Sequence, residues 1–324
     1  LAGLAVTGAL PLSSCSTDTA IPTITGEAVT SAAVAASGEG ADAELSYTDL
    51  GIDEADLLVD PTDAVELVLA DGASAGGRGV SVDGDVVTIT AAGTYHVSGS
   101  LSTGSLLVDA PDGAVTLVLD GVDITAGSVA AIDVVDAERV VLWLADGSEN
   151  VLADDSGAQV DESGQDPTNA TLFSTSDLWI AGEGALSVTA HAADAITSKD
   201  SLVIAGGEIT VEAADDGVRG KDHLVITGGA ITADVAGVAL RSDNDAQTHA
   251  AGEPVGVVPI DGGTLDLTAA SAAVDAARQV TVLSGELTIA ATDDGLHSDN
   301  VLRIDGGTID ITESYEGIEG AHLY

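Results

Sequence analysis

Short runs of alternating hydrophobic and polar residues, separated by Gly and Asp, fill the chain from Val80 to its end. The runs at 86–90 and 115–119 are examples, each of five residues drawn from Val, Ile, Leu and Thr. Runs of this length and composition, bounded by turn residues, are typical of β-strands. No long segment shows the period of an amphipathic helix. The pattern therefore predicts a domain that is almost entirely β.

A unit of two short apolar runs around a Gly-Gly or Ser-Gly pair recurs along this domain. Most copies are about 21 to 24 residues apart, and they begin at Leu178, Leu202, Leu224, Ile260, Val282 and Leu302. Each unit is too short to bury its own apolar face, so neighbouring units must stack strand on strand. Leucine-rich repeats and propeller blades fit the pattern or the length less well. We expect a right-handed, single-stranded parallel β-helix with about 22 residues per rung.

Three segments of different character precede this domain, which is predicted to span 80–324. The first ten residues are uncharged and apolar, and the following Leu12-Ser13-Ser14-Cys15 resembles the bacterial lipobox. Segment 1–15 is therefore interpreted as a signal peptide without its start, with Cys15 as the lipid attachment residue. An export signal with an incidental cysteine is the alternative. Residues 16–46, rich in Ser, Ala, Gly and acid, are expected to form a flexible linker, and 47–79 an N-terminal cap.

The repeat register is broken at 154–169 and at 244–257. Both segments are interpreted as loops inserted on one face of the solenoid, where such insertions often frame a binding surface. The chain also stops inside a rung, after the motif at 316–320. Because solenoids need capped ends for solubility, we expect that further C-terminal rungs are missing from this sequence.

The large excess of acidic residues limits the kinds of molecule that the protein could bind. Only 8 Lys and Arg residues face 54 Asp and Glu residues, for a formal net charge of −46. Nucleic-acid binding is excluded, because phosphate neutralisation needs clustered basic residues. An acidic partner such as a polyuronate would need a cation between it and the protein. The alternative is that the acidity only keeps an extracellular surface soluble.

An acidic turn follows the second run of several units. Because Asp194 and Asp216 are 22 positions apart, equivalent carboxylates are expected to stack on adjacent rungs at a spacing of about 4.8 Å. Such a stack needs solvent or cations between its members, and calcium accepts several carboxylate oxygens. The candidate calcium ligands are Asp194, Asp215, Asp216, Asp222, Asp293, Asp294 and Asp299. Asp-Asp-Gly is also a common turn sequence, so a structural role is the alternative.

Half of the basic residues lie between positions 199 and 241, namely Lys199, Arg219, Lys221 and Arg241. They are candidates for pairing with the carboxylates of a bound glycan. We expect no catalytic residue, although Lys199 or Lys221 could act as the base of a β-elimination. For the two arginines the favoured reading is neutralisation of the neighbouring Asp stacks. The six His residues show no paired spacing that would indicate a zinc motif.

Several motifs together resemble the bacterial carbohydrate-binding β-helix family, formerly a domain of unknown function, whose founding member is a clostridial cellulose- and polygalacturonate-binding protein. The motifs lie in order at 93–99, 115–124, 147–150, 173–178 and 215–222, and the resemblance covers about 80–324. It implies a pectate-lyase-like (pectin-lyase-like) β-helix that binds polysaccharide and calcium without established lyase activity. The calcium role would fall on the seven Asp residues named above. The turns at 236–238 and 272–274 lack acids, so their rungs are expected to hold no ion.

Three hypotheses follow. The first is a monomeric, non-catalytic, calcium-assisted binding protein for polyuronate or cellulose-type polysaccharide, displayed on the cell surface through its lipid anchor and touching the membrane only there. The second is a calcium-dependent polysaccharide lyase. The third is a surface or adhesin-like solenoid without a glycan ligand.

Overall fold

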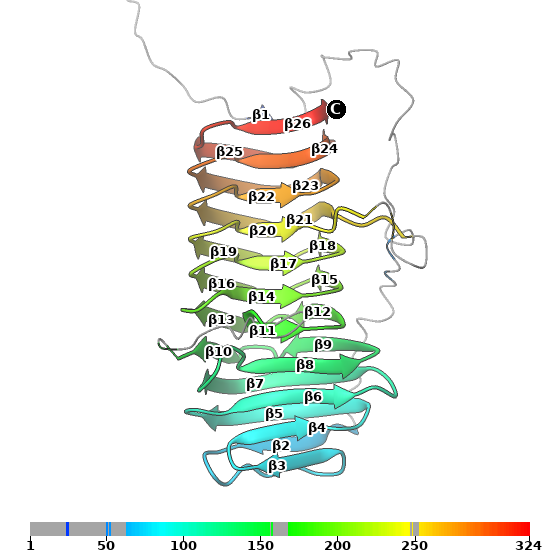
Figure 1. The fold of residues 1–324 in the computed structure, drawn as a ribbon, viewed down its shortest axis with the longest axis vertical. Coiled ribbons are helices and arrows are strands. Elements are labelled where there is room, and N and C mark those ends of the chain that lie inside the picture. The colour runs from blue at the N-terminus through cyan, green and yellow to red at the C-terminus, as the bar shows by residue number, and fades with distance from the viewer. Residues whose placement is uncertain are drawn as a thin grey trace, which may run out of the picture.

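The computed structural model describes residues 24–25, 50, 52, 63–155, 157, 168–246, 248 and 253–324, and the statements below concern these residues. They form 26 β-strands and no α-helix, stacked as successive coils along the long axis of the molecule (Figure 1). The all-β prediction is thereby confirmed. No helix in this part of the chain has the length and apolar character needed to cross a membrane. The predicted signal peptide, Cys15 and nearly all of the linker lie outside the described residues.

The strands in chain order are β1 Ile24–Thr25, β2 Val65–Leu69, β3 Val80–Asp83, β4 Val86–Ile89, β5 Gly93–Leu101, β6 Ser105–Ala110, β7 Val115–Ala126, β8 Ile132–Ala137, β9 Arg139–Leu144, β10 Glu149–Asp154, β11 Ala170–Ser174, β12 Asp177–Gly182, β13 Ala185–Ala190, β14 Asp194–Ser198, β15 Ser201–Ile204, β16 Glu208–Ala213, β17 Val218–Gly220, β18 His223–Ile226, β19 Ala230–Val235, β20 Leu240–Ser242, β21 Val257–Ala269, β22 Val274–Ala276, β23 Gln279–Ala291, β24 Leu296–Ile304, β25 Thr308–Glu313 and β26 Ile318–Leu323.

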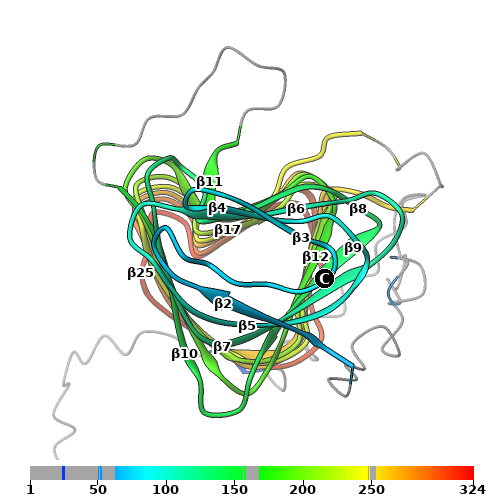
Figure 2. The ribbon, with the colours of Figure 1, turned by 90° about the horizontal axis from the view of Figure 1, so that it is seen from below.

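Each coil contributes to three stacks of parallel strands. Stack 1 runs through β4, β6, β8, β11, β14, β17, β20, β22, β24 and β26, each hydrogen-bonded to the next. Stack 2 passes through β9, β12, β15 and β18, and stack 3 through β10, β13, β16 and β19. The longer strands β21 and β23 belong to both stacks 2 and 3. Viewed along the axis, the coils lie over one another (Figure 2).

The pairing register gives the length of a coil. Leu202 lies opposite Leu224, and Leu265 opposite Leu287, each pair 22 positions apart in sequence. His223 instead lies opposite Val257, 34 positions on, because the segment predicted as an insertion at 244–257 adds residues to that coil. The predicted coil length of about 22 residues agrees with this register, and so does the predicted insertion.

One continuous apolar core fills the inside of the coils. In stack 3, alternate side chains such as Leu186, Val188, Ile209 and Val211 are buried, and the residues between them face outward. Burying one such aliphatic side chain contributes about 1.5 to 3 kcal/mol. The Gly-Gly pair marks the corner between stacks 2 and 3. A Cβ at Gly229, where φ is +87°, would meet backbone atoms of the previous corner at 2.9 to 3.1 Å, so only glycine fits there.

The N-terminal end departs from the repeat. Strands β3 and β4 form an antiparallel hairpin, and β2 already pairs in parallel with β5. Parallel pairing therefore begins at Val65, within the range predicted as a cap. Trp179 is buried on the outer side of stack 2 with Leu50, and the guanidinium of Arg139 lies 4.3 Å from its ring centroid. It is therefore not an exposed platform for sugars.

Candidate functional site

The outward side chains of stack 1 form a ladder that runs across six coils. Its members occupy equivalent register positions, one per coil, and are Thr197, Arg219, Arg241, Asp275, His297 and Glu319. We call this set the central ladder. It changes from cationic to anionic along the solenoid, because two arginines are followed by an aspartate, a histidine and a glutamate.

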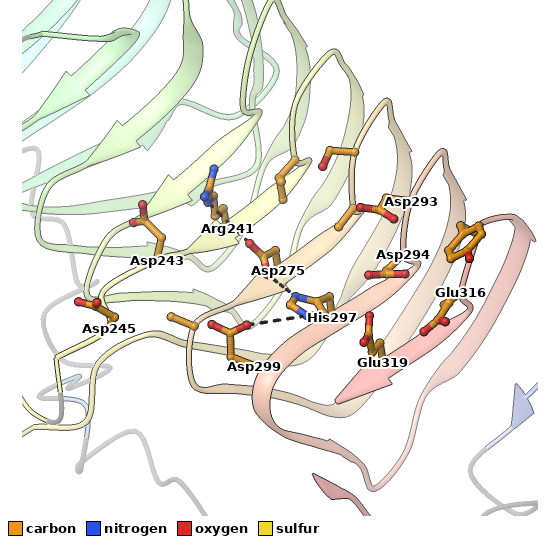
Figure 3. Close-up of a pocket in the computed structure, with 15 residues that line it drawn as sticks. Arg241, Asp243, Asp245, Asp275, Asp293, Asp294, His297, Asp299, Glu316 and Glu319 are labelled. Atoms are coloured by element: carbon orange, nitrogen blue, oxygen red, sulfur yellow. Dashed lines mark hydrogen bonds and ion pairs between the residues drawn. The ribbon is translucent and has the colours of Figure 1, made fainter. Parts of the chain in front are cut away.

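A groove of about 640 Å³ lies over the C-terminal part of this ladder (Figure 3). Its lining is mostly polar and acidic, and consists of Val238, Arg241, Asp243, Asp245, Ser271, Ala272, Asp275, Ala277, Asp293, Asp294, His297, Asp299, Tyr315, Glu316 and Glu319. The exposed ring of Tyr315 is the one aromatic carbocycle in this lining, with 79% of its surface accessible. The groove therefore combines carboxylates, the hydroxyl group of Ser271 and an aromatic face across several coils.

In the N-terminal part of the ladder, each arginine is bound by carboxylates. Arg219 donates from Nε and Nη2 to Asp243, at 3.1 and 2.6 Å, and its Nη1 lies 3.9 Å from Asp194. Arg241 donates from Nη1 to Asp216 at 2.8 Å and lies 3.8 Å from Asp275. We call Asp194, Asp216, Arg219, Arg241 and Asp243 the arginine half of the site. Each of its three carboxylates contacts one of the two arginines.

The two buried carboxylates of the arginine half are also held by hydrogen-bond donors. Asp194 accepts from Asn169 at 2.7 Å and from the Thr197 hydroxyl at 2.8 Å. Asp216 accepts from the backbone N–H of Val238 at 2.8 Å. Burial, reinforced by the charge of Asp216, raises the pKa of Asp194 to about 6. These contacts favour a structural role for both carboxylates.

The C-terminal part of the site lacks such cations. Asp294, His297 and Glu319 bring one ligand atom each within 4.8 Å of one another, and they form the carboxylate half of the site together with Asp293, Asp299 and Glu316. Asp294 is buried, with 6% of its surface exposed, and no N–H or hydroxyl group among the described residues donates to its carboxylate, whose hydrogen-bond contact is with the carboxyl group of Glu319. It faces Glu319 instead (Figure 3).

The protonation equilibria of this half reflect the surplus of negative charge. The charge of Glu316, followed by burial and the charge of Asp294, raises the pKa of Glu319. For His297, burial lowers the pKa, but the hydrogen bond from Nδ1 to Asp275 at 2.7 Å and the nearby carboxylates outweigh it, so that the pKa is raised. Both directions indicate a site that favours an added positive charge.

Calcium needs several oxygen ligands in a tolerant geometry. The carboxylate half offers the oxygens of Asp293, Asp294 and Asp299 from the predicted set, and of Glu316 and Glu319 in addition. Because the buried Asp294 lacks a donor, these residues fit a hard cation. The arginine half is less suited to a hard cation, because Asp194 and Asp216 already accept hydrogen bonds from neighbouring donors and lie beside an arginine.

The remaining predicted residues lie apart from the groove lining. Asp215 is exposed, and burial together with the charge of Asp216 raises its pKa. Asp222 accepts a hydrogen bond from Asn244 and lines a separate pocket of about 110 Å³. Lys199 lies with its Nζ 5.7 Å from the centroid of the Phe173 ring. Lys221 has no ion-pair partner among the described residues.

Sequence reasoning missed His297 and Asp275 as site residues, and did not assign Tyr315 or Glu319 a role. The signal was present, because positions 275, 297 and 319 are each 22 residues apart and so share one column of the solenoid. A search for histidine pairs at short spacing could not find this group, since its members come from different coils.

Comparison with known proteins gives three matches. The family model described as "Carbohydrate-binding domain-containing protein" matches residues 83–322. A protein of that same description from Acetivibrio thermocellus is 39% identical over 225 residues, which cover 69% of this chain and 77% of the relative. A solved structure, described as a polysaccharide lyase-like protein from C. thermocellum in a gadolinium derivative, superposes with a TM-score of 0.63 at 30% identity, covering 80% of this chain and 98% of that one.

Proposed function

We propose, from the premise that this chain belongs to the family of carbohydrate-binding domain-containing proteins, that it binds polysaccharide in the groove over stack 1. The observation that carries the proposal is the groove itself, which crosses several coils and is lined by polar ladders. A chain of sugars presents hydroxyl groups at regular intervals, and such ladders offer acceptors at the regular spacing of stacked strands.

The exposed ring of Tyr315 supports a sugar-stacking contact at the C-terminal end of the groove. Aromatic rings combine a large apolar face with a polar tip, and 79% of the surface of Tyr315 remains accessible. It lies one coil beyond Asp293 on the same rim, because the two positions are 22 residues apart. One sugar ring could therefore contact the aromatic face while its neighbour meets the carboxylates.

Calcium is proposed as the helper for an acidic glycan. Uronate carboxylates would meet the uncompensated charge of the carboxylate half, so a divalent ion between the two removes the repulsion. Asp293, Asp294 and Asp299 are the predicted ligands that line the groove.

The finer features of the protein are also proposals. The likeness to a polysaccharide lyase-like protein supports a right-handed, single-stranded parallel β-helix of the pectin-lyase type. Binding without catalysis is supported by Lys199 and Lys221, which do not line the groove where a base would be required. We further propose that the protein acts as a monomer outside the cell and is attached to the membrane through a lipid on Cys15.

Calorimetric titration of polygalacturonate and of soluble cellulose oligomers, with calcium and with chelator, tests the proposal. We expect binding that Tyr315→Ala weakens about 10-fold, a loss typical of one aromatic contact. Glu316→Gln should weaken the calcium-dependent part, whereas the matched change Asp266→Asn on the exposed side of stack 3 should not. Absence of binding to any glycan would contradict the proposal, and unsaturated products absorbing in the ultraviolet would establish the lyase alternative.

A further inference from the structure

The carboxylate half repeats the geometry of the arginine half with one residue type exchanged. In the arginine half, Asp194 meets Arg219 and Asp216 meets Arg241 from the next coil. Positions 194 and 219, 216 and 241, and 294 and 319 are each 25 apart, so Asp294 meets Glu319 where its equivalents meet a guanidinium. A cation supplied by the chain in one half is thus replaced by a carboxylate in the other.

Burial makes this exchange consequential for Asp294. The residue is 94% buried, and its carboxylate points toward Glu319 and His297. It receives no hydrogen bond from an N–H or hydroxyl group among the described residues, and its hydrogen-bond contact is with the carboxyl group of Glu319. A buried carboxylate without a donor or counterion costs several kcal/mol. Asp216, which is similarly buried, offsets this cost through Arg241 and the N–H of Val238, and the donors around Asp194 offset part of it, although burial still raises the pKa of Asp194. The unmatched Asp294 therefore points to a bound cation rather than to a solvated acidic surface.

The orientation of His297 identifies the class of cation. Asp275 accepts from Nδ1 at 2.7 Å, which fixes the tautomer and leaves the Nε2 lone pair available. A carboxylate behind a histidine in this way is the usual outer partner of a metal-binding imidazole. Asp299 lies 3.9 Å from Nε2 and supplies a further oxygen beside it.

We propose that Asp294, His297 and Glu319 bind a divalent first-row transition metal of the zinc class, with His297 Nε2 as its nitrogen ligand and Asp275 as the residue that positions the imidazole. An imidazole with two or three carboxylates is a ligand set that zinc accepts, whereas calcium takes oxygen ligands only. This inference shares Asp294 and Glu319 with the site proposed for calcium and adds a nitrogen ligand to it, but it does not require glycan binding. Among the described residues, this is the one group in which three His, Cys, Asp or Glu ligand atoms converge.

A second histidine between carboxylates provides a matched control. His96 contacts Glu66 through Nδ1 and Asp120 through Nε2, both at 3.1 Å, on the outer side of stack 2. Both of its nitrogens are engaged, and His96 is not part of a converging group of three ligand atoms among the described residues. His96→Asn therefore removes an imidazole of similar surroundings without touching the proposed site.

The experiment is calorimetric titration of chelator-treated protein with zinc and, separately, with calcium, in the absence of glycan. We expect wild type to bind zinc at least 10-fold more tightly than calcium. His297→Asn should weaken zinc binding about 100-fold and change calcium binding less than 3-fold, Asp275→Asn should weaken zinc binding about 10-fold, and His96→Asn should leave it unchanged. Thermal unfolding of each variant in chelator verifies that it is folded.

A spectroscopic measurement tests the site even if a site variant does not fold, because it uses His96→Asn protein, in which the proposed metal ligands are unchanged. Stoichiometric copper(II) should show coupling to one nitrogen in its electron paramagnetic resonance spectrum. Equal affinity for zinc and calcium, zinc binding unaffected by His297→Asn, or a spectrum without nitrogen coupling would each overturn the inference. Because glycan is absent, failure of the metal site is distinguishable from failure of glycan binding.

Discussion

The arginine half and the carboxylate half of stack 1 share one backbone arrangement but differ in how their charges are matched. In the arginine half, Arg219 and Arg241 reach back to carboxylates of the preceding coil at 3.9 and 2.8 Å. In the carboxylate half, His297 and Glu319 occupy the same ladder, and no Arg or Lys among the described residues pairs with Asp294. Under the inference above, the exchange of one residue per coil separates a structural ion pair from a metal-binding site.

The largest effect is expected from converting the first half into the second. Arg241→Glu removes the partner of the buried Asp216 and places another carboxylate beside it, so we expect the free energy of unfolding to fall by about 3 kcal/mol. Urea denaturation measures this change. Arg303→Glu is the control, because its pair with Asp305 is more exposed and should cost less than about 1 kcal/mol. An equal fall in unfolding free energy in the two variants would show that the pair of Arg241 with Asp216 stabilises the fold no more than an exposed pair does.

The pKa of Asp194 gives the next effect. Its folded-state pKa of about 6 exceeds the unfolded value of 3.8, so the folded protein binds this proton more tightly. The contribution of Asp194 to stability is therefore most favourable below pH 4 and is lost as the pH rises through 6. The total is on the order of 3 kcal/mol. The difference in unfolding free energy between wild type and Asp194→Asn, measured from pH 4 to 7, should follow this change, and a difference independent of pH would contradict it.

The reverse conversion should have a smaller effect on stability and a large one on ion binding. Glu319→Arg places a guanidinium where Arg241 stands in the arginine half, so it should pair with Asp294. We expect a modest rise in the urea midpoint in chelator and the loss of zinc binding in calorimetry. Glu313→Arg, at an exposed residue of β25, makes the same charge change outside the groove and should do neither.

The smallest effect is expected at Lys221, which has no ion-pair partner among the described residues. Lys221→Gln should change the free energy of unfolding by less than about 0.5 kcal/mol. The same variant tests the role of this residue in carbohydrate binding. Unchanged affinity for polygalacturonate would remove Lys221 from the predicted binding set.

The repeat, and with it the fold class, could be predicted because strand stacking leaves a strong local pattern. The recurrence from Leu202 to Leu224 sets the register directly, and the structure pairs these two residues. The alternation of buried and outward residues then follows from the pleat of the strands. The sequence did not indicate that parallel pairing begins at Val65. The coils near the hairpin of β3 and β4 lack the Gly-Gly corner by which the repeat was recognised.

The site was harder to predict, because its partners come from different coils. Asp215 and Asp216 are adjacent in sequence, yet one is exposed and the other is buried against Arg241. Asp222 follows the same motif but lines another pocket. What separates these residues is the direction in which each side chain leaves the turn, and composition does not encode that direction. The 25-residue offset between an acid and its partner carries the missing information.

The central claim is that the buried Asp294 binds a metal cation, whereas the buried Asp216 is paired with the guanidinium of Arg241. Urea unfolding of Asp294→Asn and Asp216→Asn, each in chelator and in excess zinc, tests it most directly. We predict that in chelator Asp294→Asn stabilises the protein by about 1 kcal/mol and Asp216→Asn destabilises it by about 2 kcal/mol. Zinc should stabilise wild type and Asp216→Asn but not Asp294→Asn. Equal destabilisation by both variants, with no difference in their response to zinc, would contradict the account.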